Sequence, residues 1–383
     1  MDNEIQVDHS ETLFKLYALQ PVLSDADQVE KLLEPLTYPK NSYSKICFHN
    51  ISFGVDAARA AEPMLSSLRE RLTEVILSNI IFSLALEGCS LKTLDLSNNP
   101  LGEKGVRAFS ALLKSQSNLE ELYLMNDDIT KEAAKAVTEL IPSTEKLKVL
   151  HFYFNRTGDE GAVFIAKIVE ASPSLEDFCC ATSWIGSKGG VAVIEALAKC
   201  RNLKKLDLSD NMLRKEAGEL LAAALLSNAG LTEVHLAHLS LQAEGAIKVG
   251  KPLTRCAPSL EVLDMSMNRI TPVAAVVLAN CVASKQFLTK LNLSGNRLTD
   301  TDGHDRLTEV DMSGNFIRKD GATCLARAVA GKPRFALLNI NDNCISEEGI
   351  SDVKVIFSGS PSMLGPLDEN DPNGEDDEWD EDL

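Results

Sequence analysis

The segments LKTLDLSNNPL at residues 91–101 and LEELYLMNDDI at 119–129 share one pattern, L-x-x-L-x-L followed by a short polar turn. The pattern recurs without gaps from residues 147, 175, 203, 231, 260, 288, 307 and 335. Successive starts from 91 to 288 lie 28 residues apart, with one interval of 29. A fixed period of this length is the signature of a stacked repeat. The sequence therefore predicts an α/β leucine-rich repeat solenoid of about ten repeats.

Each repeat contains three parts. The L-x-x-L-x-L segment alternates as a strand with one buried face requires. A turn asparagine then bonds backbone groups that would otherwise be left unpaired, and a segment such as GEKGVRAFSALLKSQSN (102–118) places apolar residues at helical spacing. Because helices are wider than strands, we expect a horseshoe like that of ribonuclease inhibitor, with parallel strands inside and helices outside. The turn asparagines are Asn99, Asn155, Asn211, Asn268, Asn296, Asn315 and Asn343.

Two intervals are shorter than the others. Leu72 to Leu91 and Leu288 to Leu307 each span only 19 residues. The second interval contains LTDTDGHDR (298–306), which has no apolar helical face, so we expect a gap in the outer helical layer there. In the first interval the strand runs from Asn79 straight into Ile80, so the usual turn region is missing.

The chain ends differ from the repeats. Residues 1–43 show no repeat, and we expect a helical cap around ADQVEKLLEPL (26–36). The repeat domain then covers residues 44–365. Residues 366–383 carry ten acidic and no basic side chains, so we expect a disordered acidic tail. That tail either keeps the protein in solution or steers a basic partner by electrostatic attraction.

The formal net charge of −18 limits the possible partners. Phosphates of nucleic acids and of anionic membranes would be repelled, whereas a basic protein would be attracted. The first ten residues are polar and acidic, unlike a signal peptide. No run reaches the roughly 18 apolar residues that a membrane span needs. We therefore expect a cytoplasmic protein without a membrane span that binds neither nucleic acid nor membrane.

Motifs for chemistry of the chain's own are weak. The six histidines show no metal-ligand spacing. The segment GAIKVGKP (245–252) resembles a phosphate-binding loop, but Pro252 stands where the magnesium-binding Ser or Thr is needed. We expect no metal, no cofactor and no catalytic nucleophile.

Acidic and polar residues follow the inner face of the predicted strands. This face is either an ordinary solvated surface or a docking surface for a basic patch. Asn292 and Asn339 lie further along the same face. We predict a partner-binding set of Asp95, Glu121, Tyr123, Asp127, Asp207, Asp264 and Asp311.

The repeats closely resemble the plant Ran GTPase-activating proteins over residues 33–383. The most specific segments are LGEKGVRAFSALLKS (101–115), LEELYLMND (119–127), LLNINDNCISEEGI (337–350) and LDENDPNGED (367–376). The resemblance implies a monomer that binds Ran in its GTP form along the edge and inner face of the horseshoe, in nucleocytoplasmic transport. It also implies that Asn126 orders the glutamine of Ran for attack by water. The activator supplies no arginine finger, and Ran brings its own magnesium and phosphate-binding loop.

The sequence departs from this family in two places. The family has an Arg-bearing loop after the strand that matches LTEVILSN (72–79), and an N-terminal Trp-Pro-Pro domain that targets the nuclear envelope; neither is found here. A shortened form, a spliced form and a faulty gene model would each explain the short intervals. Two functions therefore stay open: an activator of Ran, and a scaffold that binds a GTPase or another basic protein without activating it. Asn126 itself could act in activation or only cap a repeat turn.

Overall fold

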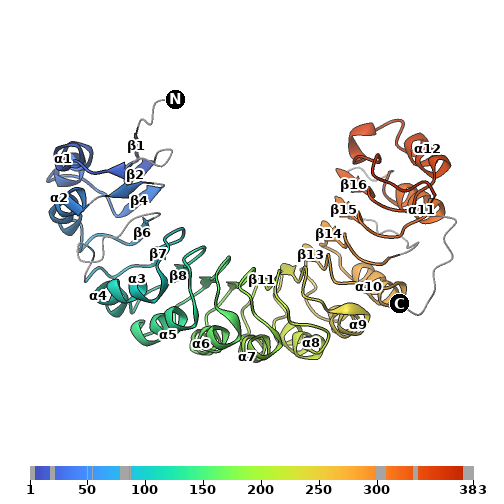
Figure 1. Cartoon of the computed structure of the whole chain (residues 1–383), viewed down its shortest axis with the longest axis horizontal. Helices are drawn as coiled ribbons and strands as arrows, with labels where there is room; N and C mark the ends of the chain where they lie inside the picture. The colour runs from blue at the N-terminus through green and yellow to red at the C-terminus, as the bar shows by residue number, and fades with distance from the viewer. Residues whose placement is uncertain are drawn as a thin grey trace. The chain divides into compact units, whose positions relative to one another are not determined.

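The computed structural model describes residues 5–17, 22–49, 51–53, 55–77, 86, 88–298, 308–330 and 335–373. Its internal contacts divide the chain into two compact units, Met1–Trp184 and Ile185–Leu383. In each unit, parallel strands lie on one side and helices on the other (Figure 1).

In the first unit, eight strands form a sheet in the order β1-β2-β4-β6-β7-β8-β9-β10. Strand β1 is antiparallel to β2, and the pairs that follow are parallel. A separate parallel pair is formed by β3 and β5. The strands are β1 (Gln6–His9), β2 (Leu13–Tyr17), β3 (Val22–Leu23), β4 (Lys45–His49), β5 (Ser52–Phe53), β6 (Glu74–Leu77), β7 (Thr93–Asp95), β8 (Glu121–Tyr123), β9 (Val149–His151) and β10 (Asp177–Cys179).

The helices of the first unit pack side by side, α1 on α2, α3 on α5 and α5 on α6. They are α1 (Ala26–Leu33), the 3₁₀ helix η1 (Glu34–Thr37), α2 (Val55–Ser66), α3 (Gly102–Ala108), α4 (Ser110–Lys114), α5 (Lys131–Leu140) and α6 (Gly158–Glu170).

The second unit repeats this plan. Strands β11 to β16 are parallel and pair in chain order. The strands are β11 (Lys205–Asp207), β12 (Glu233–His235), β13 (Val262–Asp264), β14 (Lys290–Asn292), β15 (Glu309–Asp311) and β16 (Leu337–Asn339). The helices are α7 (Ser187–Leu197), α8 (Ala217–Ser227), α9 (Gln242–Leu253), α10 (Pro272–Ala283), α11 (Lys319–Ala330), α12 (Glu347–Ile356) and the 3₁₀ helix η2 (Pro361–Met363).

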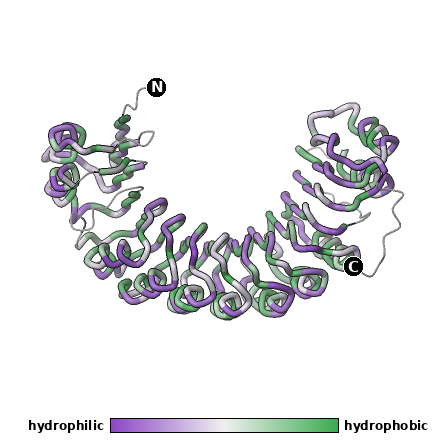
Figure 2. The backbone as a smooth tube through the Cα atoms, in the orientation of Figure 1, coloured by the Kyte–Doolittle hydropathy of each residue, from purple (hydrophilic) through white to green (hydrophobic). Residues whose placement is uncertain are grey.

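The repeat register explains the core. In the three-residue strands the middle residue is buried and its two neighbours face the open side, as for Leu94 between Thr93 and Asp95. The parallel pairing sets Leu94 beside Leu122, and Figure 2 shows apolar and polar residues alternating along the chain. Each fully buried leucine contributes about 2 kcal/mol. The predicted succession of strands and helices is confirmed.

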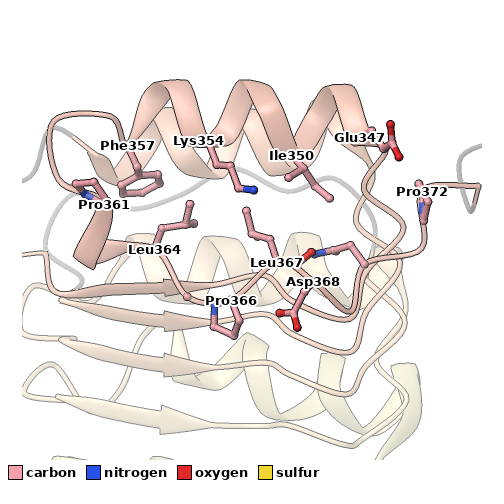
Figure 3. A pocket seen from close by; sticks show the side chains of 12 residues that line it. Glu347, Ile350, Lys354, Phe357, Pro361, Leu364, Pro366, Leu367, Asp368 and Pro372 are labelled. Carbon is pink, nitrogen blue, oxygen red and sulfur yellow. The ribbon is translucent and has the colours of Figure 1, made fainter.

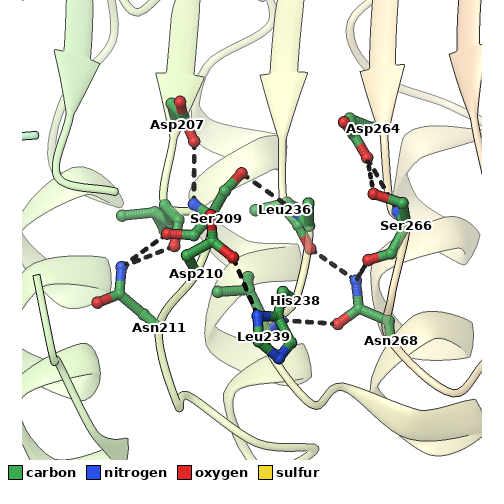
Figure 4. A network of polar contacts seen from close by, with 12 residues as sticks. Asp207, Ser209, Asp210, Asn211, Leu236, His238, Leu239, Asp264, Ser266 and Asn268 are labelled. Atoms are coloured by element: carbon green, nitrogen blue, oxygen red, sulfur yellow. Dashed lines mark hydrogen bonds and ion pairs between the residues drawn. The ribbon is translucent and has the colours of Figure 1, made fainter. Parts of the chain in front are cut away.

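The turn asparagines are buried and connect one turn to the next, as predicted (Figure 4). Asn268 is typical of them. Its Nδ2 donates to the carbonyl oxygens of Leu236, at 2.7 Å, and of Met265, at 3.1 Å. Its Oδ1 accepts from the backbone N–H groups of Leu239, at 3.0 Å, and Leu241, at 3.2 Å. One amide therefore satisfies several buried backbone groups of two repeats.

The N-terminal segment differs from the helical cap that the sequence predicts. Helix α1 and η1 lie at the expected place, but β1 and β2 come before them. Strand β2 pairs in parallel with β4, and its LFKLY residues alternate between half-buried and buried. This segment therefore begins the sheet, because the alternation gives it one face that fits the core.

Both short intervals keep the sheet continuous within their unit. Strand β6 pairs directly with β7, and β14 with β15, at offsets of 19 residues (74 to 93 and 290 to 309). The predicted missing turn at Asn79 and Ile80 lies outside the described residues, as does most of LTDTDGHDR. In the described part of the chain between β14 and β15 there is no helix.

The tail does not leave the repeats at residue 366, so that predicted boundary is wrong. Leu367 and Asn370 are buried. Asn370 Oδ1 accepts from the backbone N–H of Asn343 at 3.0 Å, as a turn asparagine does. Residues 366–373 thus add one more turn, because a leucine and an asparagine stand at repeat spacing. Residues 374–383 lie outside the described residues.

A hollow of about 840 Å³ lies between α12 and this last turn (Figure 3). Its lining includes Ile350, Phe357 and Leu364 beside the charged Glu347 and Lys354. Phe357 is buried and Ile350 and Leu364 are half-buried, so packing residues of the last described repeat line the hollow.

Candidate functional site

Asn126 lies in the turn that follows β8. Its backbone φ is 57°, in the left-handed region that asparagine tolerates better than most residues. Its side chain is exposed, and its backbone N–H donates to the carbonyl oxygen of Tyr153 at 2.9 Å. The side-chain Nδ2 donates to Asn98 Oδ1 at 3.1 Å. This bond ties the Asn126 amide to the neighbouring turn.

The backbone conformation of Asn126 is not special in itself. The same turn position has a positive φ in repeat after repeat, which fits the interpretation of Asn126 as a turn residue. What distinguishes it is a second asparagine, Asn98, one turn away. The residues with positive φ at this position are Asn98, Asn126, Phe154, Thr182, Asp210, His238, Met267, Gly295, Gly314 and Asp342.

The strands beside this turn carry a connected polar row. Glu121 Oε2 accepts from Thr93 Oγ1 and from the Tyr123 hydroxyl, each at 3.3 Å. The ring of Tyr123 meets His151 edge-on, with centroids 5.1 Å apart. His151 Nε2 lies 2.9 Å from Asp177 Oδ1. Burial, and then the Glu121 carboxylate, raise the pKa of Tyr123, so its hydroxyl keeps its proton. Glu121 and Tyr123 therefore form an ordered surface in the first unit.

The aspartates at strand ends have a structural task. Oδ1 of Asp95, Asp207, Asp264 and Asp311 each accepts from the backbone N–H two residues on, at 2.9 Å. Figure 4 shows this for Asp207 with Ser209 and for Asp264 with Ser266. Such a bond caps the start of the turn. Asp95 belongs to the first unit and the other three to the second.

Asp127 must be removed from the predicted partner-binding set. Its side chain is 0% exposed, because it occupies the position that the turn asparagine has in neighbouring repeats. Oδ1 accepts from the backbone N–H of Asn99 at 2.6 Å. The described residues offer no hydrogen-bond partner to its buried Oδ2. Burial raises the pKa of Asp127 to about 9, and the Asp95 carboxylate adds to the rise while the Asn99 N–H opposes it.

Three exposed aromatic residues near Asn126 were missed by the sequence reasoning. Tyr153, Phe154 and Trp184 are 44%, 53% and 63% exposed. A signal was present, since HFYFN (151–155) places two aromatics where DLSNN (95–99) has serine and asparagine. Asn98, which holds the Asn126 amide, was missed as well.

Metal and membrane features can be judged only for the residues described above. Among them, no group of three or more His, Cys, Asp or Glu side chains could hold a metal ion. No helix within those ranges is long and apolar enough to cross a membrane. The position of the Arg-bearing loop, after β6, falls in residues that the structure does not describe.

Comparison with known proteins supports the repeat assignment. The Leucine Rich repeat family model matches residues 89–110, 199–222, 256–279 and 284–303. Among solved structures, an internalin of Listeria monocytogenes has a TM-score of 0.49 at 13% identity, covering 91% of this chain and 85% of that one. A leucine-rich repeat protein of Leptospira interrogans has a TM-score of 0.46 at 15% identity, covering 91% and 100%. Nothing about function follows from these two.

Two relatives from Arabidopsis thaliana are much more similar. RAN GTPase-activating protein 1 is 49% identical over 135 residues, which are 31% of this chain and 25% of that protein. RAN GTPase-activating protein 2 is 52% identical over 397 aligned residues, which cover 97% of this chain and 73% of that protein. This extent of identity, on the same repeat pattern, shows that the chain belongs to the RAN GTPase-activating protein family.

Proposed function

We propose that this chain binds the small GTPase Ran in its GTP form and accelerates GTP hydrolysis in trans, as a monomer in the cytoplasm that serves nucleocytoplasmic transport. The observation that carries the proposal is the exposed Asn126 amide, held by Asn98 in a chain of this family. On this view the chain is not itself an enzyme; it acts on the active site of its partner.

The reaction requires the activator only to position groups of the GTPase, and the activator need not supply a nucleophile. Phosphoryl transfer gains chiefly from positioning and from electrostatic stabilisation of the transferred group. A glutamine of the GTPase orients the attacking water in this reaction class. Asn126 is exposed, and its Oδ1 is suited to accept an N–H from that glutamine side chain, which would fix the glutamine carbonyl on the water.

Charge supports a basic partner. The chain carries a formal net charge of −18, and half-buried acidic side chains such as Asp95, Glu121 and Asp177 lie along the strands next to Asn126. Such a field raises the association rate of a basic protein and weakens as salt rises. The roles of Asp207, Asp264 and Asp311 in binding remain part of this proposal.

The experiment that tests the proposal is hydrolysis of Ran-bound GTP in a single turnover, with and without the chain. We expect an acceleration of several orders of magnitude, on the order of 10³-fold or more. The alternative is a scaffold that binds without activating. Tight binding of Ran–GTP with no acceleration would establish the scaffold and overturn the activator.

A second prediction concerns Asn98, whose side chain accepts a hydrogen bond from the Asn126 amide. We expect Asn98→Ala to lower the rate at saturating activator by about five-fold, because one neutral hydrogen bond contributes about 1 kcal/mol to holding the Asn126 amide. The affinity for Ran–GTP should be unchanged. Asn98→Asp keeps both the acceptor oxygen and a residue that tolerates positive φ, so it should restore the rate. Equal rates for Asn98→Ala and the unsubstituted chain would show that this bond does not position Asn126.

A further inference from the structure

We propose that Tyr153, Phe154 and Trp184, here termed the aromatic patch, are an apolar docking surface for the same GTPase on which Asn126 acts. The inference rests on the proposed function and adds to it the surface that supplies the apolar part of the binding energy. Three features of the first unit carry it: exposure, backbone conformation and connection to Asn126.

The exposure of the patch is not what the fold requires. Phe152 and Phe178, from the same two repeats, are 0% exposed and fill the core. Tyr153, Phe154 and Trp184 are instead 44%, 53% and 63% exposed. Other exposed large apolar residues of this unit, Val7, Tyr38 and Val163, lie on separate elements, namely β1, the end of η1 and α6. Clustered exposed aromatics mark interaction surfaces more often than scattered ones do.

The backbone conformation adds a second argument. Phe154 and Trp184 have φ values of 56° and 59°. Bulky side chains rarely adopt this left-handed region. Asparagine, aspartate or glycine occupies the Phe154 position in six of the other nine turns, and Thr182, His238 and Met267 occupy it in the remaining three. Two aromatic residues thus accept an unfavourable conformation without gaining burial. The fold sets the positive φ at the Phe154 position, but it does not require an aromatic residue there, and residues in unfavourable conformations are concentrated at functional sites.

Hydrogen bonds connect the patch to Asn126. The Asn126 N–H donates to the Tyr153 carbonyl at 2.9 Å, so the two turns are direct neighbours. The Phe154 N–H donates to the Ala181 carbonyl at 3.0 Å, and Gly158 N–H to the Ser183 carbonyl at 3.1 Å. Those bonds join the Phe154 turn to the turn that ends at Trp184. The rings of Tyr153 and Phe154 lie with centroids 6.0 Å apart.

Because the Asn126 turn and the aromatic patch are neighbours, the protein that binds the patch should be the GTPase that contacts Asn126. A GTPase whose catalytic glutamine reaches Asn126 must cover the neighbouring turns, and the patch occupies the next two. A polar rim is also present, since the Arg156 Nε donates to Asp128 Oδ1 at 2.6 Å in the same row of turns. An apolar centre with a polar rim is the usual anatomy of a protein interface. The patch therefore fits an apolar surface on the GTPase, while the acidic strands attract its basic surface.

The test replaces Phe154 and Trp184 by asparagine, which suits positive φ and should preserve or raise thermal stability. The probe is Ran loaded with a non-hydrolysable GTP analogue, bound to the full chain at low and at high salt. We expect Phe154→Asn with Trp184→Asn to weaken binding on the order of 100-fold, by the same factor at both salt concentrations. Single-turnover hydrolysis at saturating activator should keep its rate. Met267→Asn, which changes a 54% exposed side chain at φ 55° in the second unit, is the matched control and should bind normally.

The outcomes separate the two proposals. Normal activation and normal affinity in the double variant would overturn the aromatic patch and leave the proposed function intact. Loss of self-association in the double variant, with unchanged affinity for Ran, would assign the patch to a second copy of this chain and likewise overturn the proposal. Absence of binding and activation by the unsubstituted chain would overturn the proposed function and the patch together.

Discussion

Replacing Asp127 by asparagine is expected to stabilise the first unit by about 2–4 kcal/mol at pH 7. The buried Oδ2 of Asp127 has no hydrogen-bond partner among the described residues. In the next repeat, the amide of Asn155 donates from the corresponding position to the carbonyl oxygens of Leu124, at 2.6 Å, and Phe152, at 2.8 Å. The protonated carboxyl of Asp127 has only one O–H to offer there, whereas Asp127→Asn supplies two N–H donors at nearly the same volume and cannot ionise.

The raised pKa of Asp127 predicts how the stability of the unsubstituted chain changes with pH. The pKa of Asp127 is about 9 in the folded chain and 3.8 as its ordinary value, because burial disfavours the charged form. Between these values the unfolded chain has released a proton that the folded chain still binds. Stability therefore falls as pH rises, by up to about 1.4 kcal/mol per pH unit, from near pH 4 to near pH 9. Below pH 4 both states are protonated, and this contribution vanishes.

The measurement is urea unfolding of the full chain and of Asp127→Asn across pH 4 to 9, followed by the fluorescence of Trp184, which belongs to the first unit. The advantage of the variant should grow with pH. Asp128→Asn is the control, because Asp128 is a half-buried neighbour paired with Arg156 and should show no such growth. A stability difference that is independent of pH would contradict the assignment of Asp127 as a buried neutral acid.

Most of the fold could be predicted from the repeat alone. Leucines at fixed spacing can be buried only if each repeat stacks on the next, so the strand positions and the buried turn asparagines followed directly. The N-terminal strand β2 escaped notice because LFKLY alternates without the leucine pattern. The last turn was not predicted because the acidic composition of residues 366–383 indicated a tail. Leu367 and Asn370 stand at repeat spacing within that acidic segment.

The candidate site was harder to predict. The register already set Asp127 at the turn-asparagine position, but its acidic character suggested a surface residue. Asn98 and the aromatic patch depend on which turn residues point outward at positive φ, and that follows from the three-dimensional turn. The partner-binding aspartates were identified by their alternation along strands, which does not reveal that each caps its own turn.

The central claim is that Asn126 orders the catalytic glutamine of the GTPase. Asn126→Ala removes the amide, and Asn126→Gly removes it without straining the positive φ of 57°. We expect either variant to lose about 3–5 kcal/mol of transition-state stabilisation, which is a fall in rate on the order of 10²–10⁴-fold. Binding of Ran–GTP should change little, since the glutamine contact forms fully only during the reaction. Asp342→Ala alters the same turn position in the second unit and should leave the rate unchanged.

The decisive measurement is therefore single-turnover hydrolysis of Ran-bound GTP at saturating concentrations of the unsubstituted chain, Asn126→Gly and Asp342→Ala. The account predicts rapid hydrolysis with the first and third proteins and a rate close to that of Ran alone with Asn126→Gly. Rapid hydrolysis with all three would contradict it, because activation would then not depend on the Asn126 amide.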